Sequence, residues 1–241
     1  MKSAAETQSV IEALAGQHPD ADTELHYRNA FELLVATMLS AQSTDAGVNK
    51  VTPALFATFP DARALAAAPA EQVEALIHAT GFFRQKARSL AGMSRALVDD
   101  HGGEVPHTME ALVKLPGVGR KTANVVLGHA LVVPGLPVDR HVLRVSNRLG
   151  IADSDDPERV EQQLTGALPP GLWTRASDTL ILHGRRVCKP EPLCGQCAAV
   201  DACEFHAEAA RAERHAPPAA RRRRKSGSVV PAKKPAARRR R

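Results

Sequence analysis

A proline and two glycines interrupt an otherwise helical segment near the middle of the chain. Apolar side chains recur at helical spacing over residues 109–115 and 120–130, and Pro116-Gly117-Val118-Gly119 separates the two stretches. The two glycines allow positive backbone angles and let a ligand approach the main chain closely. The second helix begins with N–H groups that lack helical partners, which suits a phosphate oxygen. The segment predicts either a helical hairpin that grips one nucleic-acid phosphate or an ordinary helical corner.

Helical periodicity extends over most of the chain. Leucine and alanine are abundant and runs of β-branched residues are short, which favours helix over sheet. Further helices are expected over residues 29–42, 71–79, 84–99, 156–168 and 172–187. No apolar run approaches the roughly 18 residues that a membrane span requires, and the N-terminus lacks the apolar segment of a secretory signal. We therefore expect an all-α protein that is neither membrane-bound nor secreted.

The positive charge lies at the C-terminus. The net charge is +6, but residues 216–241 hold eleven Lys and Arg and no acid, so residues 1–215 carry −5. This segment has too few apolar groups to offset chain entropy, and we expect disorder there. It is either a non-specific tether to DNA phosphates or a solubility tail.

All four cysteines fall within sixteen residues, in the pattern C-x5-C-x2-C-x5-C. Because no secretory signal is present, metal ligation is favoured over disulfides. Four thiolates suit zinc or a [4Fe–4S] cluster, and the single C-x2-C pair leans modestly against zinc. The cysteines are Cys188, Cys194, Cys197 and Cys203.

Longer stretches carry a family resemblance. Residues 115–127 (LPGVGRKTANVVL) closely resemble the helix-hairpin-helix of the endonuclease III family of DNA glycosylases. The resemblance continues in family order through FELL (31–34), LSAQSTD (39–45), VDRH (138–141), ILHGR (181–185) and the cysteines, over roughly residues 8–206. It implies two helical domains, one over residues 22–133 with the hairpin at about 109–130. The other combines 1–21 with 134–210 and holds the cluster at 188–203, and a disordered basic tail is expected over 211–241.

The resemblance also implies the chemistry. The family's nucleophile falls on Lys121, whose amine would attack the sugar C1′ and form a Schiff base before β-elimination cuts the strand. The family's carboxylate falls on Asp139, which would stabilise positive charge on the sugar and handle protons. The cofactor implied is a [4Fe–4S] cluster, although the first cysteine loop is one residue shorter than the usual C-x6-C. That departure leaves the loop's grip on phosphate in question.

Opening the duplex requires residues that fill the gap left by a flipped base. By the resemblance these are Gln42 and Phe82, the latter being alternatively a core aromatic. Ser40 and Asp45 are expected to line the substrate pocket. The full set of expected DNA-binding residues is Gln42, Phe82, Pro116, Gly117, Val118, Gly119, Arg120 and His141.

The expected function is therefore a repair glycosylase that removes oxidised or ring-saturated pyrimidines from duplex DNA and cuts the resulting abasic site. We expect a monomer in the bacterial cytoplasm, associated with the nucleoid. One alternative is the related adenine glycosylase, which typically lacks the lysine and carries a further recognition domain. The other is a catalytically inactive iron–sulfur module that only binds DNA.

Overall fold

The computed structural model describes the backbone of residues 1–215 and the side chains of residues 1–212. These residues form helices and no strand, which confirms the predicted all-α class. Short 3-10 turns cover His78–Thr80, Pro170–Leu172, Cys194–Gln196 and Val200–Ala202. The α-helices are α1 (Ala4–Gln17), α2 (Ala30–Leu39), α3 (Asp45–Thr58), α4 (Ala62–Ala66), α5 (Ala70–Ile77), α6 (Phe83–His101), α7 (Met109–Leu112), α8 (Arg120–Ala130), α9 (Arg140–Leu149), α10 (Pro157–Ala167), α11 (Trp173–Arg186) and α12 (Glu204–His215).

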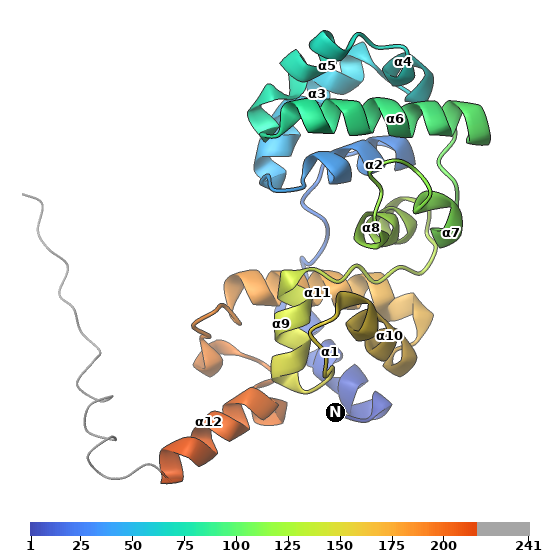
Figure 1. Ribbon diagram of the computed structural model, residues 1–241. Coiled ribbons are helices and arrows are strands. Elements are labelled where there is room, and N and C mark those ends of the chain that lie inside the picture. The colour runs from blue at the N-terminus through green and yellow to red at the C-terminus, as the bar shows by residue number, and fades with distance from the viewer. Residues whose placement is uncertain (216–241) are drawn as a thin grey trace, which may run out of the picture.

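The helices are arranged in two bodies, one above the other in Figure 1. The upper body contains α2 to α8, and the lower body contains α1 and α9 to α12. Each has its own cluster of buried apolar side chains. The chain passes between them twice, after α1 and after α8, and the expected domain boundaries at residues 22 and 134 fall in these two crossings. We keep those boundaries as our proposed division.

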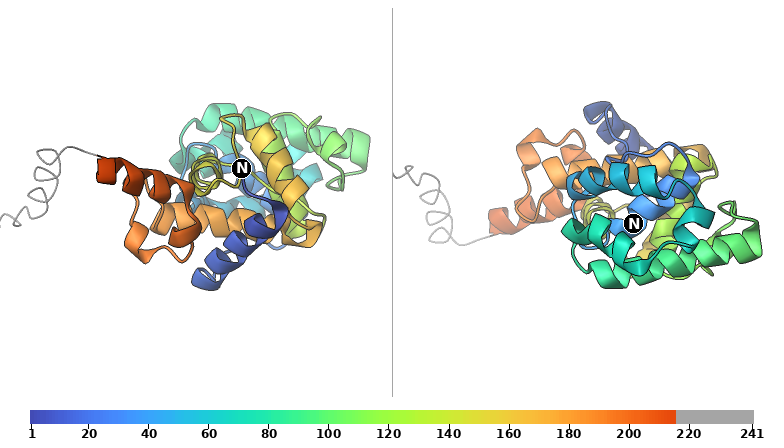
Figure 2. Two further views of the ribbon diagram at one scale, coloured as in Figure 1. Left: turned by 90° about the horizontal axis from the view of Figure 1, so that it is seen from below. Right: turned by 90° about the horizontal axis from the view of Figure 1, so that it is seen from above.

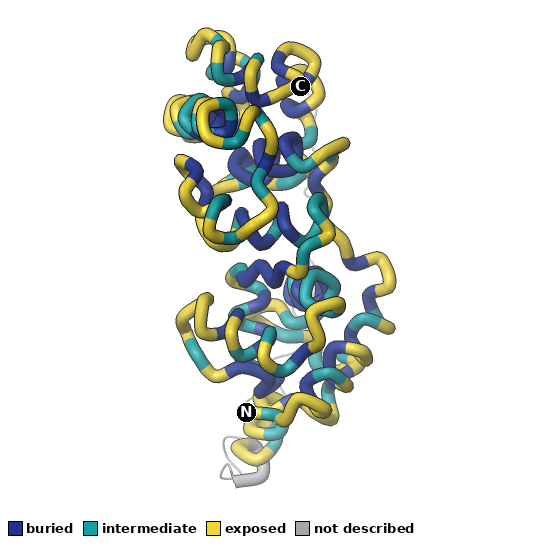
Figure 3. The backbone as a smooth tube through the Cα atoms, turned by 90° about the vertical axis from the view of Figure 1, so that its right-hand side faces the viewer, coloured by how far each residue is buried: buried dark blue, intermediate teal, exposed yellow. Residues whose placement is uncertain are grey.

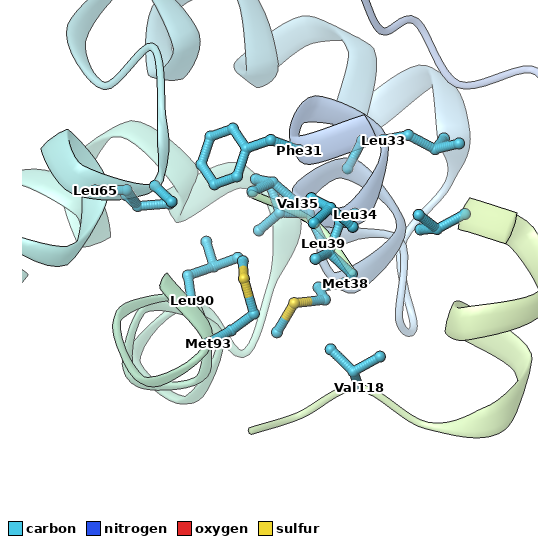
Figure 4. Close-up of a cluster of buried hydrophobic side chains, with 14 of the residues drawn as sticks. Phe31, Leu33, Leu34, Val35, Met38, Leu39, Leu65, Leu90, Met93 and Val118 are labelled. Carbon is cyan, nitrogen blue, oxygen red and sulfur yellow. The ribbon is translucent and has the colours of Figure 1, made fainter. Parts of the chain in front are cut away.

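Helix α2 is the centre of the upper body. Every residue from Phe31 to Leu39 is buried, so this helix is surrounded on all sides, as its nearly continuous apolar sequence requires. In Figure 4, Met38 of α2 lies between Met93 of α6 and Val118 of the hairpin. The hairpin is thus anchored to the core by a valine placed between its two glycines.

Helix α11 is the corresponding element of the lower body. It packs against α1 and α9, and it also contacts α8 of the upper body. Figure 3 shows that the buried positions follow the inner sides of both bodies. Seen end-on in Figure 2, α1 and α12 lie at the periphery. Helices α8 and α11 contact one another across the two bodies.

Two expectations about chain ends and helix ends need correction. The tail was expected to begin at residue 211, but α12 continues to His215; residues 216–241 lie outside the described part. The helix expected over residues 29–42 ends at Leu39, because Gln42 adopts a left-handed φ of 55°. None of the described helices is both long and apolar enough to cross a bilayer.

Candidate active site and metal centre

The hairpin turn needs Gly117 for internal reasons. Its φ is +78°, and a Cβ added there would lie 3.1 Å from Met38 Cε and 3.1 Å from Ser89 Cβ. The turn therefore packs tightly between α2 and α6, where a side chain at this position meets both strain and crowding. Pro116 and Gly117 are exposed to solvent on their other side, while Val118 is buried.

Gly119 differs from Gly117 in both respects. It is the N-cap of α8 with an ordinary φ of −93°, and nothing lies within 4 Å of a Cβ added there. No side chain caps this helix start. Nothing in the described part of the fold requires glycine here, so the missing side chain leaves the first turn of α8 open for a ligand to approach its N–H groups.

The first two residues of α8 have different environments. Lys121 is exposed in the first turn. Arg120, which is expected to contact DNA, binds Glu161 of α10 through two hydrogen bonds of 2.8 Å. That hydrogen-bonded partner raises the pKa of the Arg120 guanidinium further. Arg120 therefore joins the two bodies directly beside the expected nucleophile.

Asp139 is the N-cap of α9. Its Oδ1 accepts hydrogen bonds from the backbone N–H groups of His141 at 2.7 Å and Val142 at 2.9 Å. The side chain is half-buried, and in the described part of the chain both contacts use the same oxygen, which leaves Oδ2 for other chemistry. The carboxylate is thus a capping group and is also held in one orientation by the helix it begins.

His141 is half-buried beside Asp139. Its Nδ1 accepts from an Arg144 nitrogen at 3.2 Å. Burial lowers the pKa of His141, and the attraction of Asp139 opposes that effect. The ring is also packed against the backbone of Gly184, where a Cβ would lie 2.9 Å from the histidine Cβ. His141 is therefore held in place by α11 next to the candidate carboxylate.

The two expected duplex-opening residues line one open pocket of about 270 Å³. Phe82 is 69% exposed and so is not a core aromatic. Gln42 is also exposed, and both residues have left-handed backbones, with φ of 55° and 47°. Gly117 of the hairpin lines the same pocket, whereas Lys121 and Asp139 do not. The complete lining is Met38, Ala41, Gln42, Phe82, Gln85, Lys86, Ser89 and Gly117.

Lys86 was not anticipated from the sequence. Its side chain is buried and lines this pocket among exposed neighbours. A signal was present: Lys86 falls on the buried face of α6 with Leu90, Met93 and Leu97, where an apolar residue is the rule. A lysine at a core position of an amphipathic helix requires a local reason.

Ser40 and Asp45, the expected pocket residues, make other contacts. The Ser40 hydroxyl donates to the Thr37 carbonyl at 2.8 Å. Asp45 at the start of α3 accepts from Arg185 of α11 at 3.1 Å, and Arg185 also pairs with Glu24 at 2.8 Å. Asp45 therefore connects the two bodies through Arg185, and neither residue lines the pocket that contains Gln42.

The four cysteines line one apolar pocket beneath α9 and α11. All four are free thiols. No three of the four cysteine sulfurs lie within 4.8 Å of one another. Among the described residues, only the ligand atoms of Asp22, His129 and Asp178 lie that close together. One tetrahedral zinc with bonds of about 2.3 Å would hold its sulfurs about 3.8 Å apart. The residues present fit a larger, polynuclear group better than a single zinc ion.

Basic and neutral groups surround these sulfurs. An Arg148 nitrogen lies 3.6 Å from Cys188 Sγ, and His183 Nε2 lies 3.6 Å from Cys197 Sγ. Burial, with a smaller contribution from His18, lowers the pKa of His183 to about 4, so its ring is neutral. Arg148 also donates to the carbonyls of Lys189 and Pro190, which lie in the shortened first loop. That loop is therefore held by α9, although it is one residue shorter than the usual spacing.

Comparisons with known proteins agree with this arrangement. Residues 35–170 match the family described as HhH-GPD superfamily base excision DNA repair protein. The endonuclease III of Synechocystis sp. is 50% identical over 188 residues, which cover 77% of this chain and 86% of that one. The endonuclease III of Escherichia coli K12 is 40% identical over 197 residues, which cover 81% and 93%.

Solved structures agree as well. A trapped covalent endonuclease III–DNA intermediate superposes with a TM-score of 0.81 and 41% identity, covering 88% of this chain and all of that one. A thermostable thymine-DNA glycosylase, 21% identical with a TM-score of 0.76, shares the fold. Neither the adenine glycosylase nor the inactive binding module is favoured by these matches. This chain belongs to the endonuclease III family of base excision repair DNA glycosylases.

Proposed function

We propose that this chain excises oxidised or ring-saturated pyrimidines from duplex DNA and then cuts the abasic site through a Schiff base on Lys121. The observation that carries the proposal is the placement of Lys121, an exposed lysine in the first turn of α8, two residues after the open position of Gly119. A phosphate bound at that helix start would hold the neighbouring sugar beside the amine.

The chemical steps use a small number of groups. The neutral Nζ of Lys121 attacks C1′, the bond from C1′ to the base breaks with its electron pair on the departing base, and the base takes up a proton from the newly formed ammonium. The nitrogen lone pair then expels the ring oxygen, which takes up a proton from water, and the protonated imine forms. Loss of a C2′ proton and cleavage of the bond from C3′ to oxygen then cut the strand, and water releases the lysine.

Asp139 is the proposed electrostatic and proton-handling group. Its Oδ1 is held by two N–H groups of α9, which fixes the carboxylate without help from the substrate. Such a fixed charge costs little reorganisation when positive charge develops on the sugar. Oδ2 is the oxygen we assign to that charge and to proton transfer.

Gln42 and Phe82 are the residues proposed to fill the space of the extruded nucleotide. Both are exposed, both stand on left-handed turns, and both line the pocket that Gly117 also borders. An aromatic ring that is 69% exposed has little packing to lose when it enters the base stack. Extrusion costs a few kcal/mol, which such contacts offset.

Cys188, Cys194, Cys197 and Cys203 are the proposed ligands of a [4Fe–4S] cluster. The wide sulfur spacing and the apolar lining of their pocket support this assignment. The cluster, when bound, supplies a covalent cross-link and no redox step. It ties the short loop after α11 to the start of α12.

The remaining proposals concern the binding partner, the oligomeric state and the location in the cell. We assign the chain to damaged or abasic duplex DNA as a monomer, in the cytoplasm and on the nucleoid of a bacterium; two endonuclease III relatives named above are bacterial. Arg185 and Arg186 pair with acids of their own chain, at Asp45, Glu24 and Asp20. We therefore assign no phosphate contact to Arg185 or Arg186.

Borohydride trapping tests the central proposal. Duplex DNA with one thymine glycol is incubated with wild type, Lys121→Ala and Lys114→Ala, the last removing another exposed lysine of the hairpin. We expect a covalent complex with wild type and Lys114→Ala and none with Lys121→Ala. Trapping by Lys121→Ala would reject the assigned nucleophile. Absence of trapping by wild type, with alkali-labile sites in the same DNA, would mean base loss without a Schiff base.

A further inference from the structure

Lys86 is a buried cation without a charged partner in the described part of the chain. Only 8% of the residue is exposed. Its Nζ donates three hydrogen bonds, to the Leu39 carbonyl at 2.7 Å, the Ser43 hydroxyl at 2.8 Å and the Thr80 carbonyl at 2.8 Å. The two carbonyl oxygens can only accept, so Nζ donates to both, and the ammonium form has a third proton for the Ser43 hydroxyl.

Two electrostatic effects disfavour a charged ammonium group at this position. Burial disfavours the ammonium and lowers the pKa of Lys86. The residue also lies in the first turns of α6, where the helix dipole disfavours positive charge. Three neutral oxygens compensate for the lost water, and one of them, the Leu39 carbonyl, lies at the C-terminal end of α2, where a positive charge is favoured. A methionine would fill the same space but would leave these oxygens without their donor. The position of Lys86 is therefore explained by the groups that it joins.

The three acceptors belong to two separate turns. Leu39 ends α2, and Ser43 closes the turn that contains Gln42. Thr80 ends the 3-10 turn that precedes Gly81 and Phe82. The turns also meet directly, because the Ser43 hydroxyl donates to the Thr80 carbonyl that Lys86 binds. One ammonium group thus ties together the two loops whose tips line the pocket.

Both tips need such a restraint. Gln42 and Phe82 have φ of 55° and 47°, in a region that non-glycine residues seldom occupy. Each left-handed residue costs of order 1 kcal/mol and persists only where its surroundings over-determine it. A residue that enters a base stack must also be positioned before contact, since disorder at the tip weakens insertion. Lys86, in the wall of the same pocket, meets both needs.

We propose that Lys86 is a positioning residue, which locks the Gln42 and Phe82 turns together so that both tips enter the DNA stack as one rigid element. The inference rests on the proposed function, because it concerns the step that extrudes the damaged nucleotide. Lys86 contacts neither the sugar nor the base in this account. It acts through the two turns.

The test is a double-variant cycle on the cluster-containing protein. Lys86→Met removes the three donors and keeps the length, and Ser43→Ala is a milder change that removes one acceptor. Arg95→Met, on the exposed face of the same helix, is the matched control for loss of one charge. We expect Lys86→Met to slow single-turnover excision of thymine glycol by about 10- to 100-fold, with affinity for undamaged duplex within about twofold. Arg95→Met should leave the excision rate unchanged.

Coupling separates positioning from general loss of stability. In a Gln42→Ala, Phe82→Ala background, Lys86→Met should cost less than about threefold, because its targets are already gone. A full additional loss in that background would overturn the proposal, as would excision by both Lys86→Met and Ser43→Ala at the wild-type rate. If Lys86→Met does not fold, as judged by far-UV circular dichroism, Ser43→Ala carries the same cycle.

An unstacking assay keeps the proposal independent of excision. The probe is 2-aminopurine beside a tetrahydrofuran abasic analogue in a duplex that cannot be cut. Wild type should raise its fluorescence and the Lys86 or Ser43 variant should raise it less, even if wild type fails to excise thymine glycol. An equal rise with wild type and variant would reject the role of Lys86. Failure of wild type to excise the lesion would reject the proposed function alone.

Discussion

Arg120 and Glu161 form a two-point ion pair across the two bodies of the molecule. The guanidinium Nε binds Oε2 and Nη2 binds Oε1, each at 2.8 Å. Glu161 is buried on α10, and Arg120 is the first residue of α8. Because Lys121 is the next residue, this pair fixes the helical turn that carries the proposed nucleophile to the opposite body.

Glu161→Ala should therefore affect both stability and the lyase step. Loss of two charge-assisted hydrogen bonds is expected to lower the free energy of unfolding by about 1–2 kcal/mol. The loss is no larger because water can reach the Arg120 guanidinium and replace the lost partner. The β-elimination rate on a preformed abasic site should fall by about tenfold as the first turn of α8 loosens. Chemical denaturation and single-turnover strand cutting measure these effects. Glu12→Ala, at an exposed acid of α1 in the lower body, is the control; equal effects of the two variants would contradict the prediction.

The two hairpin glycines should respond to alanine in opposite ways. Gly117→Ala places a Cβ 3.1 Å from two side-chain carbons at a φ of +78°, so we expect a loss of about 1–3 kcal/mol of stability. Gly119→Ala meets open space at an ordinary φ and should leave the melting temperature unchanged while weakening DNA binding by about tenfold. Thermal melts and fluorescence anisotropy separate the two effects. A stability loss at Gly119, with unchanged affinity, would show that its role is internal.

The hairpin shows how far sequence reasoning reaches. Local patterns predicted its two helices, the turn and the unpaired N–H groups at the start of the second helix, because each depends on neighbours within a few residues. The same patterns could not distinguish Gly117 from Gly119. That distinction depends on Met38 and Ser89, which are remote in sequence.

Long-range partners account for the other differences. Local sequence predicts Arg120 as a DNA contact, which stays a prediction, and it gives no sign of the pair with Glu161, 41 residues away. Lys86 donates hydrogen bonds to Leu39 and Ser43, which lie 47 and 43 residues earlier in the chain. Pairings of this kind depend on how the bodies pack, and a single sequence contains no direct record of them. The periodicity of α6 does indicate that Lys86 is buried, but not what it binds.

Asp139→Asn should slow base removal while preserving DNA binding. The amide oxygen can still accept from the N–H groups of His141 and Val142, so α9 keeps its cap and the fold is retained. The variant loses the negative charge, and we expect excision to fall by about 100-fold or more. Single-turnover release of thymine glycol and affinity for an uncleavable duplex are the two measurements. Normal turnover would remove Asp139 from the mechanism.

The metal centre predicts a spectral and a structural result. The purified protein should show a broad absorbance at about 400 nm and contain four iron atoms per chain. Cys197→Ser should lose most of this absorbance. Because the cysteine segment contributes Ala199 and Cys203 to the apolar cluster of the lower body, the variant should also melt earlier. One zinc ion per chain and no visible absorbance would refute the assignment.

His129 and Asp178 predict a pH-dependent contact between α8 and α11. His129 Nε2 lies 3.0 Å from Asp178 Oδ2, and Nδ1 lies 3.0 Å from the Val125 carbonyl oxygen. Both partners accept hydrogen bonds, so the ring is favoured in its doubly protonated form. Burial is the largest single effect and opposes this charge, but the hydrogen bond and charge of Asp178, the Val125 carbonyl and the charge of Asp22 together raise the pKa of His129 above its usual 6.5.

The raised pKa determines how the stability contributed by the His129–Asp178 pair changes with pH. Below about pH 6.5 both folded and unfolded histidine are protonated, and the pair contributes its full stabilisation; this is lost as the pH rises through the pKa of folded His129. The melting temperature of wild type should therefore exceed that of Asp178→Asn by more at about pH 6 than at about pH 9. Asp201→Asn, at an exposed acid of the cysteine segment, controls for loss of one charge. A difference between wild type and Asp178→Asn that stays constant with pH would mean that His129 is neutral in the folded protein.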